Sequence, residues 1–118
     1  MFCDVAYGKL ELVMSRIESL ADYLRAEGRR KLDRVEVRDG GRNARSALAL
    51  LDAAIHTRSL GDDDPLIAVL VDAGCFGPSG REEFRPGERI IRIVRSWESG
   101  DPQELLTRIG LALREAPV

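Results

Sequence analysis

The chain has 118 residues, of which 44% are hydrophobic and 32% are charged, and its formal net charge is −2. This length and balance are typical of one folded domain and exclude a disordered chain. The small net charge excludes a general attraction to nucleic acids or anionic membranes, so any such contact needs a local cluster of charge. We therefore expect a single helical domain over residues 1–118.

Several features favour a cytoplasmic protein without membrane contact. Two cysteines, Cys3 and Cys75, are too few for a disulfide scaffold. The first residues lack the basic and apolar regions of a signal peptide. The longest apolar run, Leu66–Val71, is far shorter than the roughly 18 residues of a membrane span. Sixteen of the 18 basic residues are arginine, which a GC-rich coding sequence or a carboxylate- or phosphate-binding role would explain.

An apolar stripe at three- and four-residue spacing predicts the first helix. It is carried by Leu10, Met14, Ile17, Ala21 and Leu24. We expect this helix to run from about Val5 or Lys9 to about Glu27, with Asp4 as its cap and Gly28 as its stop. The stripe can pack inside the domain or form a seam with a partner helix. The candidate partner-helix face comprises Leu10, Met14, Ile17 and Leu24.

Residues 29–42 are interpreted as a basic connector with irregular or weakly extended structure. Leu32 and Val35 could instead extend the first helix, whereas residues 34–38 alternate as in a strand. Residues 39–41, Asp-Gly-Gly, predict a turn.

Between residues 29 and 45, seven basic residues stand against three acidic ones, a local net charge of +4. Such a cluster could contact phosphates, with an affinity that falls steeply with salt. It contains no aromatic residue on which bases could stack, and no helix-turn-helix pattern surrounds it. The alternative is a solvated loop that pairs with the protein's own acids. The candidate anion or nucleic-acid contacts are Arg29, Arg30, Lys31, Arg34, Arg38, Arg42 and Arg45.

Caps and stripes predict the later helices. Asn43 is expected to cap a helix over 44–59 and Asp64 to cap one that starts at Pro65. Residues 101–104, Asp-Pro-Gln-Glu, predict a capping box and a last helix over about 102–115. The expected apolar face of the helix over 44–59 comprises Ala44, Ala47, Leu48, Leu51, Ala54 and Ile55.

Two apolar segments, Leu66–Val71 and Arg89–Trp97, fit a helix or a strand. The Asp-Pro start of the first and the spacing of apolar residues in the second favour helices. We therefore predict an all-α fold, a compact bundle of about five helices. The alternative is an α+β fold with a small sheet from 66–72 and 89–97.

The glycine-rich loop 74–85 is a candidate ligand loop through Cys75, Phe76 and Phe84. Its glycines lack the spacing of a phosphate-binding loop or a dinucleotide fingerprint. Cys75 as a nucleophile would need a nearby base. The alternative is a connector that the two phenylalanines pin onto the core.

No catalytic constellation, cofactor motif or metal-ligand spacing occurs in the sequence. His56, the single histidine, is explained by an i,i+4 pair with Asp52. Three functional hypotheses remain. The favoured one is a non-catalytic protein-interaction module or small subunit of a larger cytoplasmic assembly, with a protein partner or self-association into an oligomer. The alternatives are a nucleic-acid-contacting accessory protein that uses 29–45 and a small-molecule-binding protein or enzyme that uses 74–85.

Overall fold

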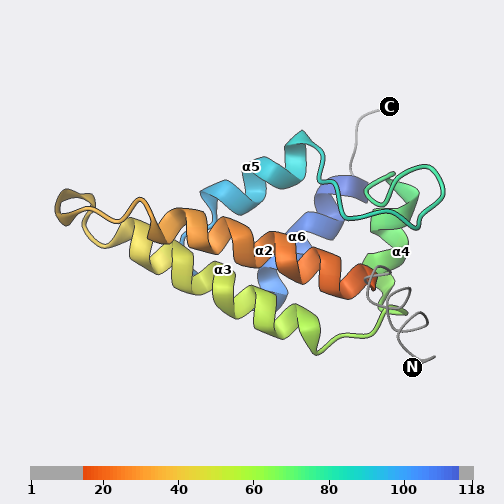
Figure 1. Cartoon of the computed structure of the whole chain (residues 1–118), viewed down its shortest axis with the longest axis horizontal. Coiled ribbons are helices and arrows are strands. Elements are labelled where there is room, and N and C mark those ends of the chain that lie inside the picture. The colour runs from red at the N-terminus through yellow and green to blue at the C-terminus, as the bar shows by residue number, and fades with distance from the viewer. Residues whose placement is uncertain (1–14, 115–118) are drawn as a thin grey trace, which may run out of the picture.

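The computed structural model describes residues 15–114 and shows, within them, five α-helices and one 3₁₀ turn (Figure 1). The elements are α2 (Arg16–Leu32), η1 (Val37–Asp39), α3 (Arg42–Arg58), α4 (Pro65–Asp72), α5 (Glu88–Ser96) and α6 (Pro102–Arg114). The all-α prediction is confirmed, and the segments of the alternative sheet are the helices α4 and α5. No helix in this part of the chain is both long and apolar enough to cross a bilayer.

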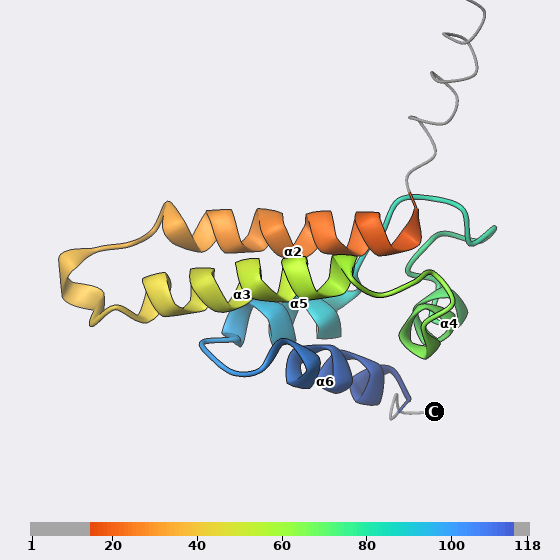
Figure 2. The same cartoon turned by 90° about the horizontal axis from the view of Figure 1, so that it is seen from below.

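The long helices α2 and α3 form an antiparallel hairpin, and the shorter helices pack beside it (Figures 1 and 2). In Figure 2, α5 and α6 lie on one side of the hairpin, and α6 contacts α3, α4 and α5. The connection between α2 and α3 projects beyond the other helices at one end of the molecule, while α4 lies at the opposite end.

Helix α2 begins and ends later than the sequence predicts. The backbone of Ser15 is extended, and its hydroxyl accepts a hydrogen bond from the Glu18 amide at 3.0 Å in a capping box. A single helix running from Val5 or Lys9 into this region is therefore wrong, and the part of that prediction before Ser15 lies outside the described residues. At its other end, α2 continues through Gly28 to Leu32.

Gly28 does not stop the helix because it serves the packing of α2 against α3. A Cβ at this position would lie 3.1 Å from the Leu51 side chain and 3.2 Å from the Ala47 carbonyl oxygen. The missing side chain allows the two helices to approach closely, which outweighs the low helix propensity of glycine.

The predicted apolar face of α3 is wrong at two of its three large members. Leu48 is 63% exposed and Ile55 is 67% exposed. Helix α3 packs against both α2 and α6, and it buries mostly small side chains that permit close helix approach. The cap is also different, since α3 begins after Gly41 in a left-handed conformation, not at Asn43. The buried residues of α3 are Ser46, Ala47, Ala49, Leu50, Ala53, Ala54 and Thr57.

The starts of α4 and α6 follow the sequence signals. Asp64 accepts a hydrogen bond from the Leu66 amide at 3.0 Å, with Pro65 in the first turn of α4. Asp101 accepts one from the Gln103 amide at 2.8 Å. The capping-box role predicted for Glu104 is wrong. Its carboxylate forms an ion pair with Arg108 at 3.3 Å.

The hydrophobic core draws large side chains from every helix and from the connection before α5. Each fully buried side chain of this size contributes about 1.5–3 kcal/mol through removal of apolar surface from water. The largest are Phe76, Leu20, Leu24, Leu50, Leu70, Ile90, Leu105, Leu106 and Ile109.

Candidate functional site

The basic segment predicted from the sequence forms the projecting end of the α2–α3 hairpin (Figure 1). This hairpin tip, residues 29–45, comprises the last turn of α2, the turn η1 and the first turn of α3. The structure thus brings all seven basic candidates into one projecting region.

The tip is folded around the carboxylate of Asp39. It accepts hydrogen bonds from the backbone amides of Glu36 at 3.1 Å and Gly41 at 2.8 Å, and from the Asn43 side chain at 3.1 Å. Stabilisation of the anion, first by the Glu36 amide, holds the pKa of Asp39 below its usual range. Gly40 and Gly41 both have positive φ angles, 66° and 77°, which glycine adopts without strain. The predicted turn is confirmed, and Asp39 is occupied in forming it.

Three of the seven basic side chains are bound to the protein itself. Arg30 pairs with Glu27 at 3.5 Å, and the Lys31 ammonium donates to the Arg95 carbonyl oxygen at 2.7 Å. Arg45 donates to a backbone carbonyl within the turn at 3.0 Å.

The other four arginine side chains of the tip are exposed. Within residues 15–114 they form no hydrogen bond or ion pair, so their planar donor groups are available to a partner. They are Arg29, Arg34, Arg38 and Arg42.

Three aliphatic side chains of the tip are also in water. Leu32 is 45% exposed, Val35 is 47% exposed and Val37 is fully exposed. The sequence pattern placed Leu32 and Val35 in a possible extension of the helix, and Val35 and Val37 in a possible strand, but it did not indicate any of them as a contact residue. Their position inside a densely charged segment could have indicated their exposure, because burying the neighbouring charged side chains is costly.

The candidate partner-helix face is only partly described. Ile17 is 4% exposed and Leu24 is fully buried, and both belong to the core of this domain. Ile17 and Leu24 therefore pack inside the domain and do not form a seam with a partner helix. Leu10 and Met14 lie outside the described residues.

The candidate ligand loop is pinned to the core by its aromatic side chains. Cys75, Phe76 and Phe84 are all at least nine-tenths buried. The ring centroids of Phe76 and Phe84 are 5.5 Å apart, and the Phe84 amide donates to the Ser19 hydroxyl at 2.7 Å. The Arg85 amide donates to the Cys75 carbonyl oxygen at 2.7 Å. These contacts leave the three candidate side chains covered.

The same burial argues against an activated thiol at position 75. Loss of hydration raises the pKa of Cys75 above its ordinary value, so the thiol remains protonated at neutral pH. His56 lies elsewhere, with its Nε2 atom 3.1 Å from Gln103 Oε1 in place of the predicted Asp52 partner. Among residues 15–114, no group of three metal-ligating side chains is gathered.

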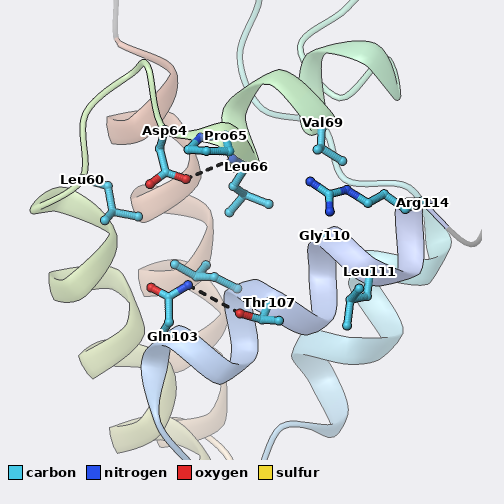
Figure 3. Close-up of a pocket in the computed structure, with 11 residues that line it drawn as sticks. Leu60, Asp64, Pro65, Leu66, Val69, Gln103, Thr107, Gly110, Leu111 and Arg114 are labelled. Atoms are coloured by element: carbon cyan, nitrogen blue, oxygen red, sulfur yellow. Dashed lines mark hydrogen bonds between the residues drawn. The ribbon is translucent and has the colours of Figure 1, made fainter.

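One feature found only in three dimensions is a cleft between α4 and α6 (Figure 3). Its lining comes from the α3–α4 connection, from α4 and from α6, segments that no sequence motif connects. Comparison with known proteins gives no further guide, because no family model, curated protein or solved structure matches the chain. The surfaces of this molecule are therefore the guide to its function.

Proposed function

We propose that this protein is a non-catalytic interaction module, a small subunit of a larger cytoplasmic assembly, whose hairpin tip binds an acidic surface of a protein partner. The observation that carries the proposal is the composition of the exposed tip. It presents four arginines that have no partner among residues 15–114, together with three exposed aliphatic side chains, while the carboxylate of Asp39 is held by hydrogen bonds in the turn.

This combination is characteristic of protein interfaces. Arginine is enriched in them and lysine is depleted, and six of the seven basic residues at the tip are arginine. Arginine forms bidentate bonds with carboxylates, which gives orientation as well as attraction. Val37 and its aliphatic neighbours supply apolar area that leaves water on association.

Nucleic acid is the second candidate for this surface because of the local net charge of +4. The tip has no aromatic side chain for stacking on bases. Its exposed aliphatic residues would also gain little from contact with phosphates. We therefore expect no measurable binding of DNA or RNA by the purified protein at physiological salt.

The test compares two variants that carry the same charge. In the tip variant, Arg29, Arg34, Arg38 and Arg42 are changed to Gln. In the matched control, four exposed arginines away from the tip, Arg58, Arg81, Arg85 and Arg92, are changed to Gln. Both variants shift the net charge from −2 to −6. A photo-crosslinking residue at position 37 then identifies the protein that contacts the tip in native lysate.

The identified partner is purified and titrated with each variant by calorimetry. We expect the tip variant and Val37→Asp each to weaken binding at least tenfold, and the control variant to bind within about twofold of the original protein. An equal loss of affinity in both charge variants would show that only the net charge of the protein matters, which would contradict the proposal. Salt-sensitive nucleic-acid binding that only the tip variant loses would assign the surface to the second candidate.

A further inference from the structure

The cleft between α4 and α6 has a volume of about 310 Å³ and lies at the end of the molecule opposite the hairpin tip (Figures 1 and 3). A volume of this size is at the lower end of those found for small-molecule sites. Its lining is mixed, and the aliphatic part comes from Leu60, Leu66, Val69, Leu106 and Leu111. The residues of the proposed protein-binding surface take no part in it.

Charge in the cleft is unevenly placed. In Figure 3 the Arg114 side chain extends over the cleft beside Val69, and it forms no ion pair within residues 15–114. The carboxylate of Asp64 lies on the other side and is bound to the Leu66 amide at 3.0 Å as the cap of α4. The two charged groups of the described lining thus lie on opposite sides of the cleft, and the guanidinium group is the one that can pair with an anionic ligand.

The neutral polar groups of the lining are paired with one another. Gln103 Nε2 donates to Thr107 Oγ1 at 3.5 Å, and Gln103 Oε1 is 3.1 Å from the His56 ring (Figure 3). They form a polar border on the side of the cleft away from Arg114.

We propose that the cleft binds a small amphipathic monocarboxylate. Its carboxylate pairs with Arg114, and its aliphatic chain lies against Leu66 and Leu106. The lining contains no aromatic side chain on which a nucleobase could stack. One guanidinium matches the single charge of a carboxylate, whereas a phosphate site usually combines several cations or backbone amides.

Gly110 offers a position from which a side chain can fill the cleft. It lies on α6 in the lining, and a Cβ placed there would be 3.5 Å from Leu66 Cδ1, an ordinary contact distance. A larger side chain at this position therefore projects into the cleft, and replacing glycine within a helix also improves helix propensity. Gly110→Leu is expected to fill the site while α6 remains helical.

The experiment titrates octanoate, below its micellar concentration, into the isotope-labelled full-length protein and follows amide shifts by NMR. We expect saturable shifts confined to α4 and α6. Arg114→Gln should weaken binding about tenfold, as for the loss of one charge-assisted hydrogen bond, and Arg25→Gln, which removes the same charge elsewhere, should not. 1-Octanol and octylammonium should each bind about tenfold more weakly than octanoate or worse, and Gly110→Leu should abolish the shifts with helicity retained.

Several results would overturn the proposal. The first is the absence of saturable shifts, and the second is saturable shifts at other helices only. Equal affinity for octanoate and octanol, or an Arg114→Gln variant that binds as well as the original protein, would show that no carboxylate is recognised. Full binding by Gly110→Leu would place the ligand outside the cleft. None of these results bears on the hairpin tip.

Discussion

The hairpin tip and the loop 74–85 are both candidate contact sites in the sequence, yet the fold treats them in opposite ways. At the tip, Val37 is fully exposed and four arginines have no partner within the described part of the chain. In the loop, Phe76 is completely buried and Phe84 nearly so. The difference follows from desolvation. Removing an aromatic ring from water stabilises the fold, whereas removing a dense cluster of positive charges from water destabilises it. In this protein, the segment that combines glycine with aromatic residues packs onto the core, and the segment that combines arginine with aliphatic residues is exposed to solvent.

The sharpest test of this contrast is a truncation in each region. Phe76→Ala should lower the free energy of unfolding by about 3–5 kcal/mol, because it removes a buried ring and leaves a cavity. Val37→Ala should change it by less than about 0.5 kcal/mol, since the side chain is already in water. Urea unfolding followed by circular dichroism measures both. Similar losses for the two variants would mean that the loop is not part of the core.

A smaller effect is expected at the hydrogen bond that fixes the loop to α2. Ser19→Ala removes the acceptor of the Phe84 amide and leaves that buried N–H group without a partner. The expected loss of stability is about 1–3 kcal/mol. Ser79→Ala, at an exposed position of the same loop, is the matched control and should be neutral. If Ser19→Ala is also neutral in the same unfolding measurement, the loop is held by its aromatic side chains alone.

At the tip, the turn around Asp39 should respond to acid. Its folded pKa is depressed below the unfolded value of about 3.9, so the contribution of the carboxylate is fully present above that value. It is lost as the pH falls through the lower folded pKa. NMR titration should therefore show the Glu36 and Gly41 amides shifting below about pH 4. In Asp39→Asn, the same amides should show no such transition, and an unchanged titration would assign it to another carboxylate.

The smallest effect on stability is expected from the four exposed arginines of the tip, Arg29, Arg34, Arg38 and Arg42. Neutralising all of them should change the free energy of unfolding by no more than about 0.5 kcal/mol, because exposed charges contribute little. Thermal or urea unfolding of the tip variant checks this. A large loss of stability would show that these side chains support the fold. Weaker partner binding by the tip variant could then reflect a disturbed fold instead of lost contacts.

The parts of the fold that the sequence predicted well are those decided by neighbouring residues. Asp64 and Pro65 start α4, and Asp101 and Pro102 start α6, because a cap and a fixed φ angle act within one turn. The turn at residues 39–41 was predicted for the same reason. Local chemistry was sufficient in each case.

The errors arose where contacts between helices decide the outcome. Gly28 resembled a helix stop, but its role is visible only beside Leu51 of α3. Leu48 and Ile55 resembled core residues, and they are exposed because α3 buries its small residues against two neighbours. Helical periodicity gives the presence of an apolar face but not which helices will cover it.

The candidate sites show the same division. The basic cluster was visible as a run along the chain, whereas the cleft brings Leu60, Leu66 and Arg114 together from three separate segments. No spacing rule connects those positions. The exposure of Val37 likewise depends on the hairpin projecting beyond its neighbours (Figure 2).

The close approach at Gly28 has a consequence for the thermodynamics of association. It fixes α2 against α3 immediately before the tip begins at Arg29, and the turn beyond is held by the three hydrogen bonds to Asp39. A binding segment that is ordered before it meets its partner loses little conformational entropy on docking. We therefore expect the tip to bind as a preorganised element, with a heat-capacity change that matches rigid-body burial and does not include the folding of a loop.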